Sequence, residues 1–283
     1  MIMVQAAGFS DIGKVRKVNE DCFLLNEPIG LYVVADGMGG HRGGDVASRL
    51  AVKTIEAYLT NESEQSLESG GHALEDALSE ATHRLRQSIL LANQRIYKQS
   101  VQDASCRGMG TTVSALYLCG DSMITANVGD SPIYLLRNGE IENLYTPHTL
   151  LNERRKIPKS MQGRFSNGKL AHVLTRAVGI RSQVGIDYVE TQCFTNDIVV
   201  LCSDGLSGKI SRNEIRDLVY QNDSESACRK LTDLANQRGG EDNITVVVVR
   251  IQSAQGKLGG GLLQRMGGFP AWIASWFGSK VRT

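Results

Sequence analysis

The sequence lacks paired cysteines, long apolar runs and a strong net charge, which are the features of metal-ribbon, membrane-spanning and nucleic-acid-binding proteins. None of its six cysteines forms a C-x-x-C pair, which argues against a zinc ribbon or a thioredoxin motif. No apolar run approaches the ~20 residues that span a bilayer, and the N-terminus lacks the basic and apolar segments of a signal peptide. The formal net charge of +1 favours neither nucleic acid nor a strongly acidic partner. We therefore expect a cytoplasmic protein with reduced, buried thiols and no nucleic-acid partner.

What the sequence does have is the patterning of a globular chain. Its 283 residues are 41% hydrophobic and 22% charged, enough to bury a sizeable core. LYVVADG at 31–37 and DIVVLCSDG at 197–205 each resemble a buried strand that ends in Asp-Gly. Helical spacing predicts helices near 45–59 and 74–96, and a capping box at Ser211 begins another.

The middle of the chain, from about residue 111 to 145, alternates apolar strands with short turns and predicts a meander. Asn138-Gly139 is typical of a type I′ hairpin, because both central residues of that turn need positive φ. A second C-terminal helix is expected near 224–238, and DNITVVVVRI predicts a closing strand. Strands with paired helices indicate an α+β layered domain with sheets inside and helices outside.

Several aspartates stand where an apolar strand meets a turn. They are Asp36, Asp130, Asp204 and Asp242, and Asp21 lies just before the apolar pair Phe23-Leu24. Each one alone is compatible with an ordinary turn, because Asp-Gly is a common turn dipeptide. Together they predict a polyanionic pocket that divalent cations such as Mg²⁺ or Mn²⁺ would neutralise.

Seven motifs in order carry a resemblance to a known family. They are GKVRKVNED, VVADGMGGHRGGDVAS, GMGTTVSAL, ANVGDSPIYLLRNGEI, VLTRAVG, VVLCSDGL and GGEDNITVVVV, across residues 9 to 251. The sequence is similar to the bacterial branch of the 2C-type, or PPM, metal-dependent protein phosphatases. That resemblance implies a four-layer α-β-β-α sandwich with two central, mainly antiparallel β-sheets. It would occupy residues 1–252, with a flap at roughly 146–173 and a separate tail at 253–283.

The resemblance also implies a site. Asp36 and Arg16 would be the catalytic residues, with Arg16 binding the substrate phosphate, and the metal ligands would be Asp36, Gly37, Asp204, Asp242, Asp21 and Asp130. Of these, Asp130 would serve only a weak third ion, because Gly208 stands where relatives frequently have a second acid. Glu20 stands where the bacterial branch often has Gln. Many eukaryotic relatives have a histidine where this chain has Met38, so the nearby His41 is one candidate for the general acid and otherwise an exposed loop residue.

The implied function is hydrolysis of phosphoserine and phosphothreonine by a water molecule that two Mn²⁺ or Mg²⁺ ions activate. Its partners would be phosphorylated proteins, with a bacterial Ser/Thr kinase as the opposing enzyme. The alternative is a catalytically weak phosphatase-fold module that binds or regulates. A calcium-binding EF-hand protein is disfavoured because the D-x-[DN]-x-[DN]-G loop is missing.

Two further segments invite hypotheses. The flap sets many basic residues against one acid, Glu153, and either selects acidic substrates or is an ordinary solvated surface. The tail contains FPAWIASWF, which either contacts a membrane surface or a partner, or packs back on the domain.

Overall fold

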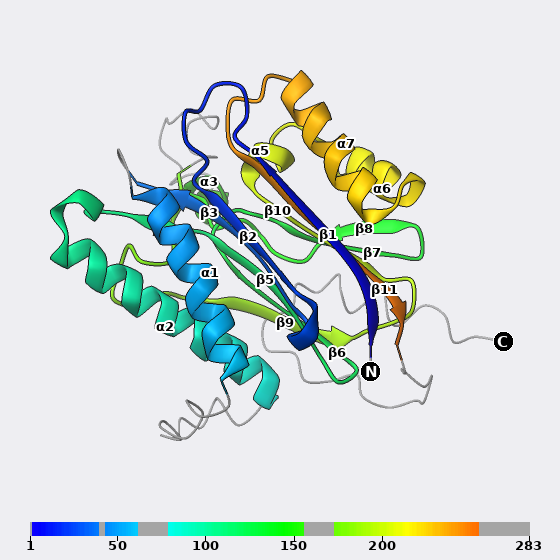
Figure 1. The fold of residues 1–283 in the computed structure, drawn as a ribbon, viewed down its shortest axis with the longest axis horizontal. Coiled ribbons are helices and arrows are strands. Elements are labelled where there is room, and N and C mark those ends of the chain that lie inside the picture. Colours follow the sequence, from blue (N-terminus) through cyan, green and yellow to red (C-terminus); the bar gives the residue numbers. More distant parts are fainter. Residues whose placement is uncertain (1, 40–42, 62–78, 156–172, 255–283) are drawn as a thin grey trace.

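Two antiparallel β-sheets lie face to face in the computed structural model, and a pair of helices covers the outer face of each (Figure 1). The structure describes residues 2–39, 43–61, 79–155 and 173–254. Three hydrophobic clusters fill the spaces between the four layers. The predicted α-β-β-α sandwich is therefore confirmed.

The first sheet has the order β2-β3-β5-β6-β9, with short β4 paired to the end of β3. Helices α1 (Gly44–Thr60) and α2 (Glu80–Gln102) cover it. Its strands are β2 (Asp21–Asn26), β3 (Leu31–Met38), β4 (Gly110–Thr111), β5 (Val113–Cys119), β6 (Ser122–Val128) and β9 (Asp187–Gln192). Alternate residues of β3 face the helices and the other sheet, and both faces are buried, which explains why its sequence is a continuous apolar run.

The second sheet has the order β1-β11-β10-β7-β8, and α6 (Arg212–Gln221) and α7 (Ser224–Gln237) pack on it. Its strands are β1 (Met3–Asp11), β7 (Ile133–Arg137), β8 (Glu140–Asn143), β10 (Ile198–Cys202) and β11 (Ile244–Ser253). The predicted capping box is present, since the Ser211 and Glu214 side chains each bond the other residue's backbone. The short helices η1 (Glu27–Ile29), η3 (Ala104–Cys106), α3 (Leu150–Arg155) and α5 (Asp204–Ser207) lie in the connections.

The hairpin of β2 and β3 fixes the position of two predicted site residues. The strands pair antiparallel from Asn26 opposite Leu31 to Asp21 opposite Asp36. Directly opposed residues of an antiparallel pair carry their side chains on the same face of the sheet. The two carboxylates therefore lie side by side at the end of the sheet away from the turn.

The predicted meander is divided between the two sheets. β5 and β6 form a hairpin in the first sheet, and β7 and β8 form one in the second. Asn138 and Gly139 both have positive φ, as the hairpin prediction required. Between the hairpins the chain crosses at Gly129–Pro132, which places Asp130 at the junction of the sheets.

The structure corrects two details of the sequence predictions, the burial of the cysteines and the start of the second helix. Cys119 is exposed and Cys22 is partly exposed, so the prediction of buried thiols is wrong for these two and holds for the other four. Helix α2 begins at Glu80, with Ser79 as its N-cap. Residue 41, most of the flap and the tail lie outside the described residues. No helix in the described part of the chain has the length and apolar character needed to cross a bilayer.

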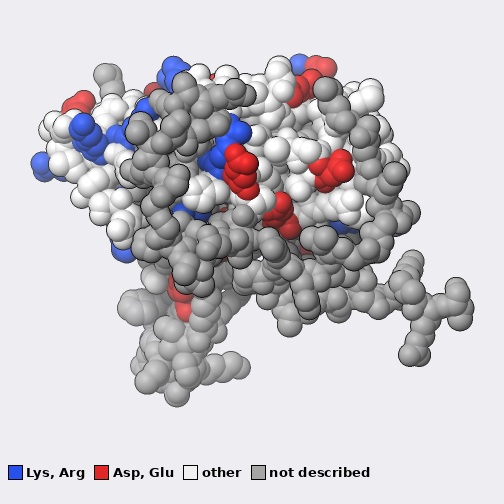
Figure 2. All heavy atoms as spheres, turned by 90° about the horizontal axis from the view of Figure 1, so that it is seen from below, with Lys and Arg blue, Asp and Glu red and all other residues white. Residues whose placement is uncertain are grey.

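The surface charges of the described residues are mixed in sign. Figure 2 shows one face on which basic and acidic side chains lie beside one another among uncharged residues. This agrees with the near-zero net charge of the sequence.

Candidate active site

Five strand ends and turns bring the predicted acidic residues together at one end of the two sheets. Asp21 begins β2 and Asp36 lies near the end of β3. From the second sheet, α5 starts at Asp204, separated from the end of β10 by one residue, and Asp242 precedes β11. With Asp130 at the crossover, these acids lie close enough that Asp21, Asp204, Asp130 and Asp242 each act on the charge of Asp36.

Asp36 is at the centre of this cluster. Burial raises the pKa of its carboxyl well above the ordinary value, and the negative charges of the four neighbouring aspartates raise it further. The effect is electrostatic: in a site poor in water, one carboxylate makes ionisation of the next more costly. The site therefore favours anything that brings in positive charge.

Asp21 and Asp130 show the same behaviour. Burial raises the pKa of Asp21 to about 7, against the opposing influence of the nearby Thr245 and Ser203 hydroxyls. Burial, together with the charge of Asp204, also raises the pKa of Asp130 to about 7. Both carboxylate oxygens of Asp21 are buried without a hydrogen-bond partner of normal geometry. A buried, unpartnered carboxylate is costly, so these oxygens are suited to a cation or to water bound to one.

Two threonines hold the backbone of Asp36. The Asp36 N–H donates to Thr112 Oγ1 at 3.0 Å, and the Asp36 carbonyl accepts from Thr112 N–H at 2.8 Å and Thr111 Oγ1 at 2.9 Å. Thr112 Oγ1 also lies 2.7 Å from Ser131 Oγ, next to Asp130. The Thr112 hydroxyl thus links the backbones that carry two of the acids.

Glycine follows Asp36 and Asp204 because nothing larger fits. A Cβ on Gly37 would lie 2.1 Å from the Gly44 carbonyl oxygen, and a Cβ on Gly205 would lie 2.0 Å from the Asn243 carbonyl oxygen. Real Cβ atoms do not approach backbone oxygens so closely. The bare backbone lets the strand ends pack against neighbouring loops around the acidic cluster.

Arg16 reaches the cluster from an exposed loop. Its Nη2 donates to Asp242 Oδ2 at 2.8 Å, and about half of each side chain remains exposed. Partial burial lowers the pKa of Arg16, but the hydrogen bond with Asp242 and the charges of Asp242, Glu20 and Asp36 raise it overall. A guanidinium held in this way remains charged and keeps other N–H groups available for a phosphate.

Asn243 anchors the loop that carries Arg16. Its Nδ2 donates to the carbonyls of Ile12 at 2.9 Å and Val18 at 3.0 Å, and its Oδ1 accepts from the Glu20 N–H at 2.9 Å. Asn243 is 4% exposed, so these bonds are shielded from water. A buried asparagine therefore sets the position of Arg16 and of the start of β2.

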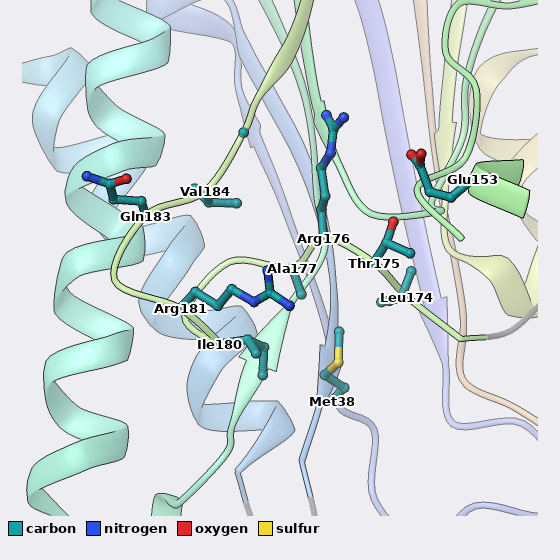
Figure 3. Close-up of a pocket in the computed structure, with 11 residues that line it drawn as sticks. Met38, Glu153, Leu174, Thr175, Arg176, Ala177, Ile180, Arg181, Gln183 and Val184 are labelled. Atoms are coloured by element: carbon teal, nitrogen blue, oxygen red, sulfur yellow. The ribbon is translucent and has the colours of Figure 1, made fainter. Parts of the chain in front are cut away.

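A cavity of about 540 Å³ has Met38, two residues beyond Asp36, in its lining. Figure 3 shows Ile180 and Arg181 on one side of Met38 and Glu153 on the other. The remaining lining of the cavity includes Arg176 and several apolar side chains. The acidic cluster and this cavity together offer a charged centre with a neighbouring pocket for part of a larger substrate.

The donor set suits hard divalent cations, which prefer carboxylate and carbonyl oxygens. No three described His, Cys, Asp or Glu side chains already stand in ligand geometry around one point. The fit to metal rests instead on the mutually raised pKa values and on the unpartnered oxygens of Asp21. Fold and site thus define a class: an α+β domain with a buried polyanionic centre at one end of its two sheets and an arginine held beside it.

Comparison with known proteins gives the family. A family model described as protein phosphatase 2C matches residues 15–247. The serine/threonine phosphatase Stp of Listeria welshimeri is 34% identical over 254 residues, covering 85% of this chain and 93% of that protein. Protein phosphatase PhpP of Streptococcus pneumoniae is 31% identical over 247 residues, covering 85% and 94%.

Solved structures of serine/threonine phosphatases also match this chain in fold. The Mycobacterium tuberculosis serine/threonine phosphatase PstP/Ppp superposes with a TM-score of 0.75 at 28% identity, covering 89% of this chain and 100% of that one. A structure of the PstP catalytic domain with two manganese ions gives a TM-score of 0.73 at 30% identity, covering 88% and 99%. The chain belongs to the protein phosphatase 2C family and is a protein serine/threonine phosphatase, as its motifs predicted.

The predicted site residues all gather here. Asp21, Asp36, Gly37, Asp130, Asp204, Asp242 and Arg16 lie at this end of the sheets. Sequence reasoning missed Asn243, the way the two threonines hold Asp36, and the cavity. Asn243 carried a weak signal, since it directly follows Asp242 before the valine run.

Proposed function

We propose that this phosphatase hydrolyses phosphoserine and phosphothreonine in proteins with two divalent cations, Mn²⁺ or Mg²⁺, held by the acidic cluster. The observation that carries the proposal is the raised pKa of Asp36 among four other carboxylates. Such a cluster is most stable when ionised and neutralised by cations. The related PstP catalytic domain was solved with two manganese ions.

In this proposal Asp36, the Gly37 carbonyl, Asp204 and Asp242 would hold the first ion, and Asp36 with Asp21 would hold the second. Asp130 would serve only a weak third ion. When bound, the cations lower the pKa of water towards neutrality and stabilise negative charge on the phosphoryl group.

The chain's own residues then orient the substrate. Arg16 donates to phosphate oxygens, and Asp242 holds the guanidinium beside the cluster at 2.8 Å. Asn243 fixes the loop so that Arg16 does not have to be ordered when substrate binds. The general acid that protonates the leaving serine or threonine oxygen is not identified by the structure, because the candidate His41 lies outside the described residues. The assignment of His41 to this role stays a prediction.

The proposal extends to partners and boundaries. Phosphoproteins are the substrate class, and an opposing bacterial Ser/Thr kinase is the expected source of their phosphate. Residues 1–252 would form the catalytic domain, consistent with a family match that ends at residue 247. A contact between the tail, 253–283, and a membrane surface or partner stays a hypothesis.

Substitution of the acids tests the proposal. Asp36→Asn, Asp204→Asn and Asp242→Asn each keep side-chain size and remove one charge, so each should lose most Mn²⁺-dependent hydrolysis of p-nitrophenyl phosphate. Circular dichroism should show an intact fold, and EDTA should inactivate the wild type until Mn²⁺ or Mg²⁺ is restored. Near-normal turnover with a clean metal titration in any of these variants would refute the metal assignment. Wild-type protein without metal-dependent turnover would favour the catalytically weak binding module.

A further inference from the structure

We propose that the cavity beside the acidic cluster is a substrate-specificity subsite for an acidic side chain near the phosphorylated residue, and that Arg181 recognises it. This inference rests on the proposed function, because it assigns to the same site a preference among phosphopeptides. The ligand chemistry is an anionic side chain on an extended peptide, either a carboxylate or a second phosphate.

The cavity is structurally continuous with the cluster. Its wall at 174–180 is tied to β4, because Thr111 and Val178 exchange two backbone hydrogen bonds of 3.0 and 2.9 Å. Thr111 in turn holds the carbonyl of Asp36. Met38 pairs with Gly110 across the strands, and Ile180 packs so closely on Gly110 that a Cβ there would lie 2.7 Å from it. The position of the cavity wall relative to the acidic cluster is therefore fixed by these backbone contacts.

This continuity sets the reach of the subsite. Met38 follows Asp36 by two residues, which in a strand corresponds to about 6–7 Å between their Cα atoms. An extended peptide advances about 3.3 Å per residue. A substrate with its phosphate at the cluster would place a residue one to three positions away inside the cavity.

The two arginines of the cavity differ in availability. Arg176 is already engaged: its Nη1 donates to Asp187 Oδ1 at 2.7 Å and lies 3.2 Å from His148 Nε2. Figure 3 shows its guanidinium pointing away from Met38 and Ile180. His148 accepts a hydrogen bond from the Gly129 N–H and its other ring nitrogen faces Asp187. Arg176 therefore stabilises the fold together with His148 and Asp187, and its guanidinium is not available to a ligand in the cavity.

Arg181 is exposed and has no acidic partner among the described residues. Its guanidinium extends over Ile180 and Ala177 into the cavity, and Glu153 lies on the opposite side (Figure 3). Its backbone is held in place, because the Arg181 carbonyl accepts a hydrogen bond from Asn93 Nδ2 at 3.0 Å. A cation beside apolar walls attracts an anion more strongly than one surrounded by water. Met38, Ile180 and Val184 supply those walls.

The test compares phosphoserine peptides that differ only in the three residues flanking the phosphoserine on each side. These positions carry Gln, Glu, Lys or a second phosphoserine. The readout is the ratio of kcat/KM for each charged peptide to that for the Gln peptide, so any general change in activity cancels. The variants are Arg181→Gln and Arg181→Glu, and Arg212→Gln on α6 is the matched control, an exposed arginine over the other sheet.

We expect wild type and Arg212→Gln to favour the Glu peptide over the Gln peptide about fivefold, the size of one partly exposed ion pair. Added salt should shrink this preference. Arg181→Gln should abolish it, and Arg181→Glu should favour the Lys peptide. A second phosphoserine that alone shows the preference assigns the subsite to phosphate, and a Glu preference assigns it to carboxylate. Equal ratios for all peptides in the wild type, or a preference that survives in Arg181→Gln, would overturn the inference.

Failure of the proposed function is distinguishable from failure of this inference. If wild type hydrolyses neither p-nitrophenyl phosphate nor any phosphopeptide with Mn²⁺ present, the catalytic assignment fails and the subsite falls with it. If wild type hydrolyses both but without regard to flanking charge, only the subsite is wrong.

Discussion

Asn243 gives the sharpest test of how the site is built. Asn243→Asp changes almost nothing in shape but replaces the Nδ2 donor with an oxygen. The carbonyls of Ile12 and Val18 then lose their donor and face a negative charge, while the Glu20 N–H keeps its acceptor. We expect the loop that carries Arg16 to lose its fixed position.

The structure sets the magnitude. Two lost hydrogen bonds cost about 1–3 kcal/mol together, and repulsion in a buried site adds to this, so the free energy of unfolding should fall by about 3 kcal/mol. Each 1.36 kcal/mol of lost transition-state stabilisation lowers the rate about tenfold. If half of the cost falls on the position of Arg16, kcat/KM for p-nitrophenyl phosphate should drop about tenfold.

The assays are urea denaturation and steady-state kinetics at saturating Mn²⁺. Asn243→Ala separates lost hydrogen bonds from added charge, and it should also be destabilised and slow. Asn222→Asp is the control, because it loses one hydrogen bond to the Leu218 carbonyl at the end of α6. Wild-type stability and kcat/KM in both Asn243 variants would show that the loop is positioned by other contacts.

Three further predictions concern other parts of the molecule. Asp197→Ala should lower the free energy of unfolding by about 3–5 kcal/mol in urea, because it strands the buried guanidinium of Arg137, now held by two 2.7 Å bonds; a loss under 1 kcal/mol would contradict this. Gly208→Asp should move a weak, late phase of Mn²⁺ activation to lower Mn²⁺ concentration, because it adds a carboxylate ligand. The new Cβ would lie 2.9 Å from the Asp204 carbonyl oxygen, so the gain in Mn²⁺ affinity must outweigh the cost of relieving that contact. An unchanged single-step titration would rule out a weakened third site. Hydrogen bonds from Arg238 lower the pKa of Glu214 to about 2, so its stabilising contribution is complete above pH 4.5 and is lost as the pH falls towards 2. Glu214→Gln should flatten the pH dependence of the melting temperature in that window, and an unaltered slope would show the pair to be inert.

The sequence predicts the elements whose signal is local. β3 and β10 lie in the two predicted apolar runs, although β3 continues past Asp36-Gly37 to Met38 and Asp204-Gly205 begins α5 after β10 has ended at Cys202. Asn138-Gly139 dictates its own turn. β1 was missed, because MVQAAGFSD is weakly alternating and becomes a strand by pairing along its length with β11. β9 likewise depends on its partner β6.

The division of strands between two sheets could not be predicted either. A hairpin pattern says that two strands are neighbours but not which sheet they join, and Gly-Asp-Ser-Pro at 129–132 predicts a turn without saying that the turn crosses between sheets. The acids of the site were found because their residue type and position at strand ends are local features. Asn243 and Thr112 act through contacts with segments that are distant in sequence, which no local pattern encodes.

The register of β2 and β3 means that the turn at 27–30 helps to determine the geometry of the acidic cluster. Asp21 meets Asp36 because five pairing steps, about 17 Å, separate them from the pair at the turn. Adding or deleting one residue in that turn would offset the strands and carry Asp21 to the wrong neighbour or the wrong face. Loops at the surface usually tolerate changes of length. This one should accept substitutions at its exposed residues Glu27 and Pro28 but resist insertions, so a length constraint at one end of the molecule would report on chemistry performed at the other.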